Sequence, residues 1–127
     1  MEKDELTYAV IGCAMKVHNT LGPGFQEVIY QRCLAIELER AGIGYKREQE
    51  QVVFYDGIEV GLRRADFIVE DSVVVELKAL VRLEDAHLAQ AKNYTLAYDF
   101  PKGLLINFGG KSLEYKLLFN PKYQDQK

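Results

Sequence analysis

An apolar octapeptide at residues 73–80, VVVELKAL, is the feature that most constrains how this chain can fold. Six of its eight residues are apolar, which is typical of a strand buried on both faces of a sheet. Glu76 and Lys78 interrupt the run, and in a strand their side chains share one face, about 6.6 Å apart. Uncompensated charges in such a sheet cost several kcal/mol, so these two must be paired, hydrated or bound to a metal.

The first third of the chain is helical in pattern. Apolar residues recur at helical spacing over residues 6–17, and the LGPG segment that follows cannot continue the helix. A second helix is predicted to begin near Phe25 and to include Arg40, and the glycines at 42 and 44 end it.

From Gln49 the pattern changes to period two or to continuous apolar runs, which predicts three consecutive strands. Asp56-Gly57 and Asp71-Ser72 are the turn signals between them. A third helix is expected over residues 84–98, and GLLINFG and LEYKLLF are the last two strands.

The predicted order is therefore ααβββαββ. A helix between strands indicates a crossover that places the GLLINF strand parallel to a neighbour. We expect an α/β (α+β) fold with a mixed central sheet flanked by helices. At 127 residues the chain fits a single domain, 1–127, with a polar tail that frays from about residue 120.

Composition limits the functional classes. Sixteen basic and nineteen acidic residues give a net charge of -3, so any binding of nucleic acid must be local. Cys13 and Cys33 lack metal-ligand spacing, and we expect a reduced thiol pair. No apolar run approaches the roughly 20 residues of a spanning helix, and residues 1–4 lack the apolar core of a signal peptide. A cytoplasmic protein with no membrane contact is expected.

A second carboxylate lies on the strand before the octapeptide. Arg64 and Asp66 share one face of that strand. Counting outward from a two-residue turn places Asp66 opposite Leu77, on the other face from Glu76. A one-residue change of turn length or a bulge would bring Asp66 and Glu76 to the same face, and we assume that change.

Two interpretations of these charges stay open at this point. In the structural one, Glu76 pairs with Lys78, or Asp66 pairs with Arg64, at the surface of the sheet. In the functional one, two carboxylates and a backbone carbonyl bind Mg²⁺, with waters and a phosphate completing the octahedron. Lys78 would then orient or deprotonate a water, or neutralise charge that develops in the transition state.

Polar residues on two helices favour the functional interpretation. His87, Gln90 and Tyr94 form one stripe of the third helix that suits a charged cleft, although a solvated stripe is the alternative. Glu27 lies in the first turn of the second helix, on the same inward stripe as Tyr30. The helix dipole accounts for a glutamate in a first turn, but not for its place on the inward stripe.

Several motifs together resemble the PD-(D/E)XK nuclease superfamily. Asp66 stands ten residues ahead of the Glu76-Leu77-Lys78 tripeptide and with it resembles the Asp…(Asp/Glu)-x-Lys signature, with Ala65 in place of the usual proline. QAKNY at residues 90–94 resembles the Gln-x-x-x-Tyr element of the RecB-like branch. Five segments in order resemble the GxxExxY family: HNTLGPGFQEVIY, LAIELERAGI, RADFIVED, VVVELKAL and GLLINFG. The resemblance implies a restriction-endonuclease-like core, in agreement with the predicted order.

The resemblance also implies roles at the site. Asp66 and Glu76 would be metal ligands together with the carbonyl of Leu77. Glu27 would contribute to the metal or to its water, and Lys78 would be the catalytic lysine.

Four further residues would support the site or touch nucleic acid. These are Gln90, Tyr94, His87 and Arg64. His18, in the matching HNTLGPG stretch, receives no role beyond a helix-end or cleft contact.

The expected function is metal-dependent hydrolysis of phosphodiester bonds by a nuclease acting on DNA or RNA, with Mg²⁺ or Mn²⁺ as cofactor. The alternative is a catalytically silent module of the same fold that binds nucleic acid or a protein partner, which the net acidity favours. A homodimer or larger assembly is a further expectation, because the core is small and residues 114–119 are typical of an open edge strand.

Overall fold

The computed structural model describes residues 3–97 and 99–123, whose helices and strands follow the predicted order. They occupy these ranges: α1 Lys3–Leu21, α2 Glu27–Arg40, β1 Tyr45–Tyr55, β2 Ile58–Val69, β3 Val73–Lys78, α3 Asp85–Ala97, β4 Lys102–Asn107, β5 Glu114–Phe119 and the 3-10 helix η1 Pro121–Tyr123. The expected helix end at Tyr98 and the tail at 124–127 lie outside the described residues. Among the helices of the described part, none is both long and apolar enough to cross a membrane.

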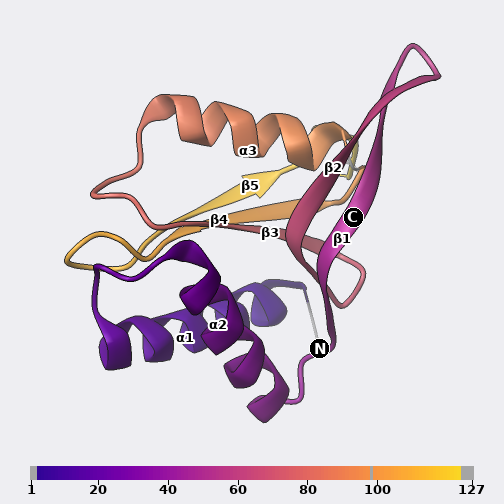
Figure 1. The fold of residues 1–127 in the computed structure, drawn as a ribbon. Coiled ribbons are helices and arrows are strands. Elements are labelled where there is room, and N and C mark those ends of the chain that lie inside the picture. The colour runs from indigo at the N-terminus through magenta and orange to yellow at the C-terminus, as the bar shows by residue number, and fades with distance from the viewer. Residues whose placement is uncertain (1–2, 98, 124–127) are drawn as a thin grey trace.

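The strands form one mixed sheet in the order β1-β2-β3-β4-β5. All neighbours are antiparallel except β3 and β4, which are parallel because α3 carries the chain back between them. The helices α1 and α2 cover one face of the sheet and α3 covers the other (Figure 1). The predicted mixed sheet flanked by helices, with its restriction-endonuclease-like topology, is therefore confirmed.

The two faces of the sheet are packed unequally. The larger apolar cluster lies between the sheet and the α1/α2 pair and includes the fully buried Phe67 and Leu77. On the α3 face the cluster of buried apolar residues contains only Ala65, Ile68 and Val74 among the described residues. The smaller cluster leaves part of the α3 face to polar side chains.

The connection between β2 and β3 is one residue longer than the counted turn. Val69 pairs with Val73, so three residues separate the strands and the counted register was wrong. Residues 70–71 both adopt left-handed backbone conformations, with φ of 50° and 52°, and this makes room for the longer turn. The assumed change of turn length is thus present, and it brings Asp66 beside Glu76.

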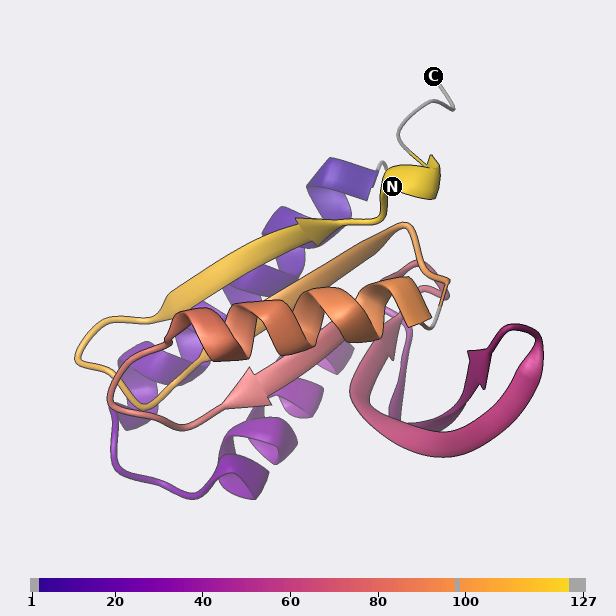
Figure 2. The same ribbon diagram turned by 90° about the horizontal axis from the view of Figure 1, so that it is seen from above.

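The strands β1 and β2 extend well beyond the rest of the sheet. β1 begins four residues before the predicted Gln49, and it pairs with β2 along nearly the whole length of both strands. β3 pairs only with residues 67–69 of β2. Residues 49–65 therefore form a two-stranded arm that curls away from the other strands (Figure 2).

Candidate active site

The candidate site lies where β2 separates from β3. Their ladder ends at Phe67 and Val75, and the next residue of β2 is Asp66. Asp66 Oδ2 accepts a hydrogen bond from the Leu77 N–H at 2.7 Å, and Asp66 Oδ1 accepts one from Gln31 Nε2 at 3.2 Å. The carboxylate therefore bridges the two diverging strands, and the two donors fix its orientation.

Glu76 is a buried acid on the α3 face of β3, and its side chain is only 9% exposed. Its Oε2 lies 3.9 Å from Arg63 Nη2, and its Oε1 has no hydrogen-bond partner among the described residues. The pKa of Glu76 is raised to about 8, first by burial and then by the Asp66 carboxylate, while the charges of Arg63 and Lys78 oppose the rise. Without a further cation, Glu76 therefore keeps its proton at neutral pH.

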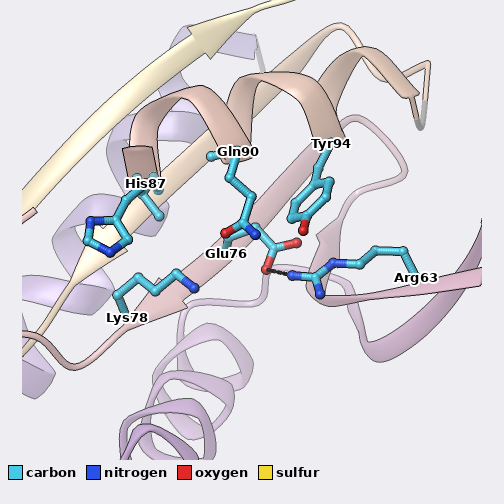
Figure 3. Close-up of a pocket in the computed structure, with 8 residues that line it drawn as sticks. Arg63, Glu76, Lys78, His87, Gln90 and Tyr94 are labelled. Carbon is cyan, nitrogen blue, oxygen red and sulfur yellow. Dashed lines mark ion pairs between the residues drawn. The ribbon is translucent and has the colours of Figure 1, made fainter. Parts of the chain in front are cut away.

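A narrow pocket between β3 and α3 brings Glu76 together with Lys78. The ammonium of Lys78 and the carboxyl group of Glu76 point into the same space (Figure 3). The predicted stripe of α3, formed by His87, Gln90 and Tyr94, lines the other side of this pocket. The structure thus brings these five residues together, although their chemical roles remain predictions.

The arginine of the pocket is Arg63, whereas Arg64 was the arginine predicted for the site. Its guanidinium lies over the ring of Tyr94, 4.1 Å from the ring centre. Arg64 is absent from the pocket lining and instead lies 3.9 Å from two glutamates of β1, Glu48 and Glu50.

A break in the alternation of side chains along β2 explains why Arg63, and not Arg64, lines the pocket. Ala65 and Ile68 are three residues apart yet pack in the same cluster, which strict alternation does not allow. The residue of β1 that should face Asp66 is Glu48, whose φ is 48°, and this pair is missing from the register. The register also shifts farther along the hairpin, between Val53 and Phe54. No sequence signal marks the break, because a glutamate is not typical of a left-handed position.

Glu27 is the first residue of α2, and α2 lies on the opposite face of the sheet from α3 (Figure 1). The pKa of Glu27 is raised above its ordinary value, first by partial burial and then by the charge of Asp66. The charges of Lys78 and Arg63 oppose this rise. These influences place Glu27 within electrostatic reach of the charged groups around Glu76.

Tyr30 holds the loop that leads into Glu27. Its hydroxyl donates to the Gly22 carbonyl oxygen at 2.6 Å and accepts a hydrogen bond from the Phe25 N–H at 3.2 Å. Gly24, in the same loop, has a φ of 105°, which side chains disfavour. The spacing of Gly24, Glu27 and Tyr30 thus has a structural reason: the glycine permits the turn, the tyrosine anchors it and the glutamate begins the helix.

A polar network that was not predicted holds the chain after Lys78. The buried Asn107 accepts a hydrogen bond from the Leu80 N–H at 2.8 Å and donates to the Leu80 carbonyl oxygen at 2.9 Å. Asn107 also donates to Glu114 Oε1 at 2.8 Å, and this oxygen accepts from the Leu83 N–H at 3.0 Å. In sequence these residues look like ordinary strand-end polar groups, so nothing pointed to the network.

His18 lies outside the pocket. Its Nε2 is 2.9 Å from the carbonyl oxygen of Gly110 in a buried contact. This contact ties the end of α1 to the connection between β4 and β5, so His18 makes a helix-end contact.

Asp66 and Glu76 are the candidate ligands for a divalent cation. Within residues 3–97 and 99–123, no group of three or more His, Cys, Asp or Glu side chains is arranged to hold a metal ion. Two acidic side chains do converge, Asp66 and Glu76, and one buried oxygen of Glu76 lacks a hydrogen-bond partner in the part of the chain that the structure describes. Mg²⁺ is usually bound through one or two carboxylates and keeps several waters beside a substrate phosphate. The residues present fit an ion of that kind.

Comparisons with known proteins agree with the fold. A family model described as the PD-(D/E)XK nuclease superfamily matches residues 4–117. The chain is similar to a solved structure titled "Crystal structure of SSO0001", with 22% sequence identity and a TM-score of 0.59. That match covers 74% of this chain but half of the other, and at this identity it speaks for the fold alone. No curated protein is significantly similar to the chain in sequence.

Proposed function

The chain belongs to the PD-(D/E)XK nuclease superfamily, and from this premise we propose that it hydrolyses phosphodiester bonds of DNA or RNA with the help of Mg²⁺ or Mn²⁺. The observation that carries the proposal is the meeting of Asp66, Glu76 and Lys78 where β2 leaves β3. Two acids and an amine at one point are the groups that a metal-assisted hydrolysis needs.

In this proposal Asp66 and Glu76 hold the ion, together with the carbonyl of Leu77. A bound Mg²⁺ or Mn²⁺ would lower the pKa of a water and offset charge on the phosphate. Lys78 orients the attacking water or neutralises negative charge as it develops, and Glu27 supports the water from the α2 side.

The pocket residues of α3 and β2 have supporting roles in the proposal. Gln90 and Tyr94 hold the site or touch nucleic acid, as in the RecB-like branch, and His87 lies at the pocket's other end. Arg63, between Glu76 and the ring of Tyr94, is a better candidate for phosphate than Arg64, because it already lines the pocket. The Gly24, Glu27 and Tyr30 geometry supports placing the chain in the GxxExxY family.

The proposal also treats the chain as one domain built on a single continuous sheet. It includes a cytoplasmic location, which the free thiols of Cys13 and Cys33 support.

Replacement of Lys78 by alanine tests the proposed chemistry. Purified protein with Mn²⁺ or Mg²⁺ is expected to nick plasmid DNA or cleave RNA, and Lys78→Ala should lower the rate about 100-fold or more, since a positioned acid–base group contributes that much. Lys116→Ala, at an exposed position of β5, is the matched control and should keep full activity. Cleavage by Lys78→Ala at the wild-type rate would overturn the mechanism, and metal-independent binding without cleavage would favour a binding module.

A further inference from the structure

Gln31 is a buried polar residue of α2 whose side chain joins two strands of the sheet. Its Nε2 donates a hydrogen bond to Asp66 Oδ1 on β2 at 3.2 Å, and its Oε1 accepts one from Arg47 Nη2 on β1 at 2.8 Å. Gln31 is only 6% exposed, so its amide depends on these partners to offset the loss of water. The three side chains form one hydrogen-bonded chain that ends on a candidate metal ligand.

Arg47 decides which end of the Gln31 amide faces Asp66. A guanidinium is a donor only, so it binds the amide oxygen, and the amide nitrogen is left to donate to the carboxylate. In the reversed amide, two donors would face each other at Arg47 and two acceptors would face each other at Asp66. The arginine therefore excludes the orientation in which Gln31 would repel the carboxylate.

The amide of Gln31 also keeps the charge of Arg47 one residue away from Asp66. A guanidinium bound directly to a carboxylate forms a charge-assisted pair that can occupy both oxygens. Here each oxygen of Asp66 accepts from a neutral donor, Oδ1 from Gln31 and Oδ2 from the Leu77 N–H. Because an ionised carboxylate has about four lone-pair sites, these two donors orient it and still leave sites for a cation.

We propose that Gln31 and Arg47 are positioning residues of the candidate site. Arg47 fixes the amide of Gln31, and the amide holds the Asp66 carboxylate in the orientation that binds the cation. Removing a partner that stands behind a metal ligand typically lowers metal affinity or activity about 10- to 100-fold. The purpose of the arrangement rests on the proposed function, but the orientation of Asp66 is measurable in the metal-free protein.

The Leu77 N–H reports the orientation of Asp66 without a metal. The β2-β3 ladder ends at Phe67 and Val75, so this N–H lies beyond the ladder and donates to Asp66 Oδ2 at 2.7 Å. Exchange of the Leu77 amide proton with solvent deuterium requires that this hydrogen bond open. A carboxylate that swings freely should protect this amide less, whereas the amides of β4 should report only the stability of the sheet.

Hydrogen exchange of the metal-free full chain, followed by NMR, tests the positioning. Gln31→Met keeps the length of the side chain but cannot donate, and Arg47→Met removes the group that orients the amide. Relative to the amides of β4, each should speed exchange at Leu77 about tenfold or more. Arg47→Lys can still donate to the Gln31 oxygen and should retain most of the protection. Arg32→Met, at the exposed next position of α2, is the control and should match the wild type.

Mn²⁺ titration of the same proteins, followed by electron paramagnetic resonance, tests the purpose. Gln31→Met and Arg47→Met should weaken Mn²⁺ binding about tenfold or more, and Arg32→Met should bind as the wild type does.

The outcomes separate this inference from the proposed function. Unchanged exchange at Leu77 in Gln31→Met, or exchange that rises equally at Leu77 and throughout β4, would contradict the positioning role. Mn²⁺ binding that is equal in the wild type and Gln31→Met would overturn this inference alone. A wild-type protein that binds no Mn²⁺ would overturn the proposed function and with it the purpose of the arrangement, while exchange at Leu77 would still show whether Gln31 holds Asp66.

Discussion

The carboxyl group of Glu76 should make the stability of the whole protein depend on pH. Its pKa is about 8 in the fold against an ordinary value of 4.5, so the folded state keeps a proton that the unfolded chain releases. The resulting contribution to stability is fully present below pH 4.5 and is lost as the pH rises toward 8, on the order of a few kcal/mol. Glu76→Gln cannot titrate and should lose less stability over that range.

Urea unfolding at several pH values between 5 and 8, with a chelator present, measures this difference. Glu5→Gln, an exposed acid of α1, is the control and should follow the wild-type curve. If the free energy of unfolding changed with pH by the same amount in the wild type and in Glu76→Gln, the prediction would be contradicted.

Single residues of the site were predictable only where local geometry is regular. The shared face of Glu76 and Lys78 follows from strand alternation alone. The place of Asp66 depended on a turn of one more residue, which requires φ near 50° at residues 70–71. Arg64 was predicted for the site in place of Arg63 because alternation breaks beside them, and that break depends on tertiary pairing with β1 rather than on local residue types.

The loop between α1 and α2 should be stabilised mainly by one hydroxyl. Tyr30→Phe keeps the ring but removes the hydroxyl that binds the Gly22 carbonyl and the Phe25 N–H, and it should lower the free energy of unfolding by about 1–3 kcal/mol. Tyr8→Phe removes a hydroxyl from a side chain that is 70% exposed and should cost nothing measurable. Equal unfolding midpoints in urea for the two variants would contradict the anchoring role of Tyr30.

The order of helices and strands was predictable because the spacing of apolar residues along the sequence differs between helices and strands. Helical spacing over residues 6–17 and the apolar run at 73–80 correspond to α1 and β3. The early start of β1 at Tyr45 was not predictable, since residues 45–50 are mostly polar and are drawn into the sheet by pairing with β2. Where such a strand begins depends on pairing with a distant segment of the chain, and the spacing of apolar residues carries no information about that pairing.

At the scale of the molecule, the two faces of the sheet differ in how much apolar surface they bury. The α1/α2 face holds the larger apolar cluster, so it supplies most of the burial that stabilises the fold. The α3 face has the smaller apolar cluster, and it buries the acid Glu76, one oxygen of which has no hydrogen-bond partner within residues 3–97 and 99–123. A group that destabilises the fold and persists in a pocket is typical of a functional site.

A divalent cation should therefore stabilise the protein while it removes a proton. A ligand that binds only the folded state raises the free energy of unfolding by about 2.7 kcal/mol at 100 times its dissociation constant. Scanning calorimetry should show the melting temperature rising with Mn²⁺ or Mg²⁺ in the wild type, but not in Asp66→Asn or Glu76→Gln. Asp85→Asn, an exposed acid at the start of α3, should respond as the wild type does. Because Glu76 must ionise to bind the cation, titration near pH 7 in buffers of different ionisation enthalpy should report release of about one proton per ion. A melting temperature that responds equally in all four proteins would place any bound cation away from Asp66 and Glu76.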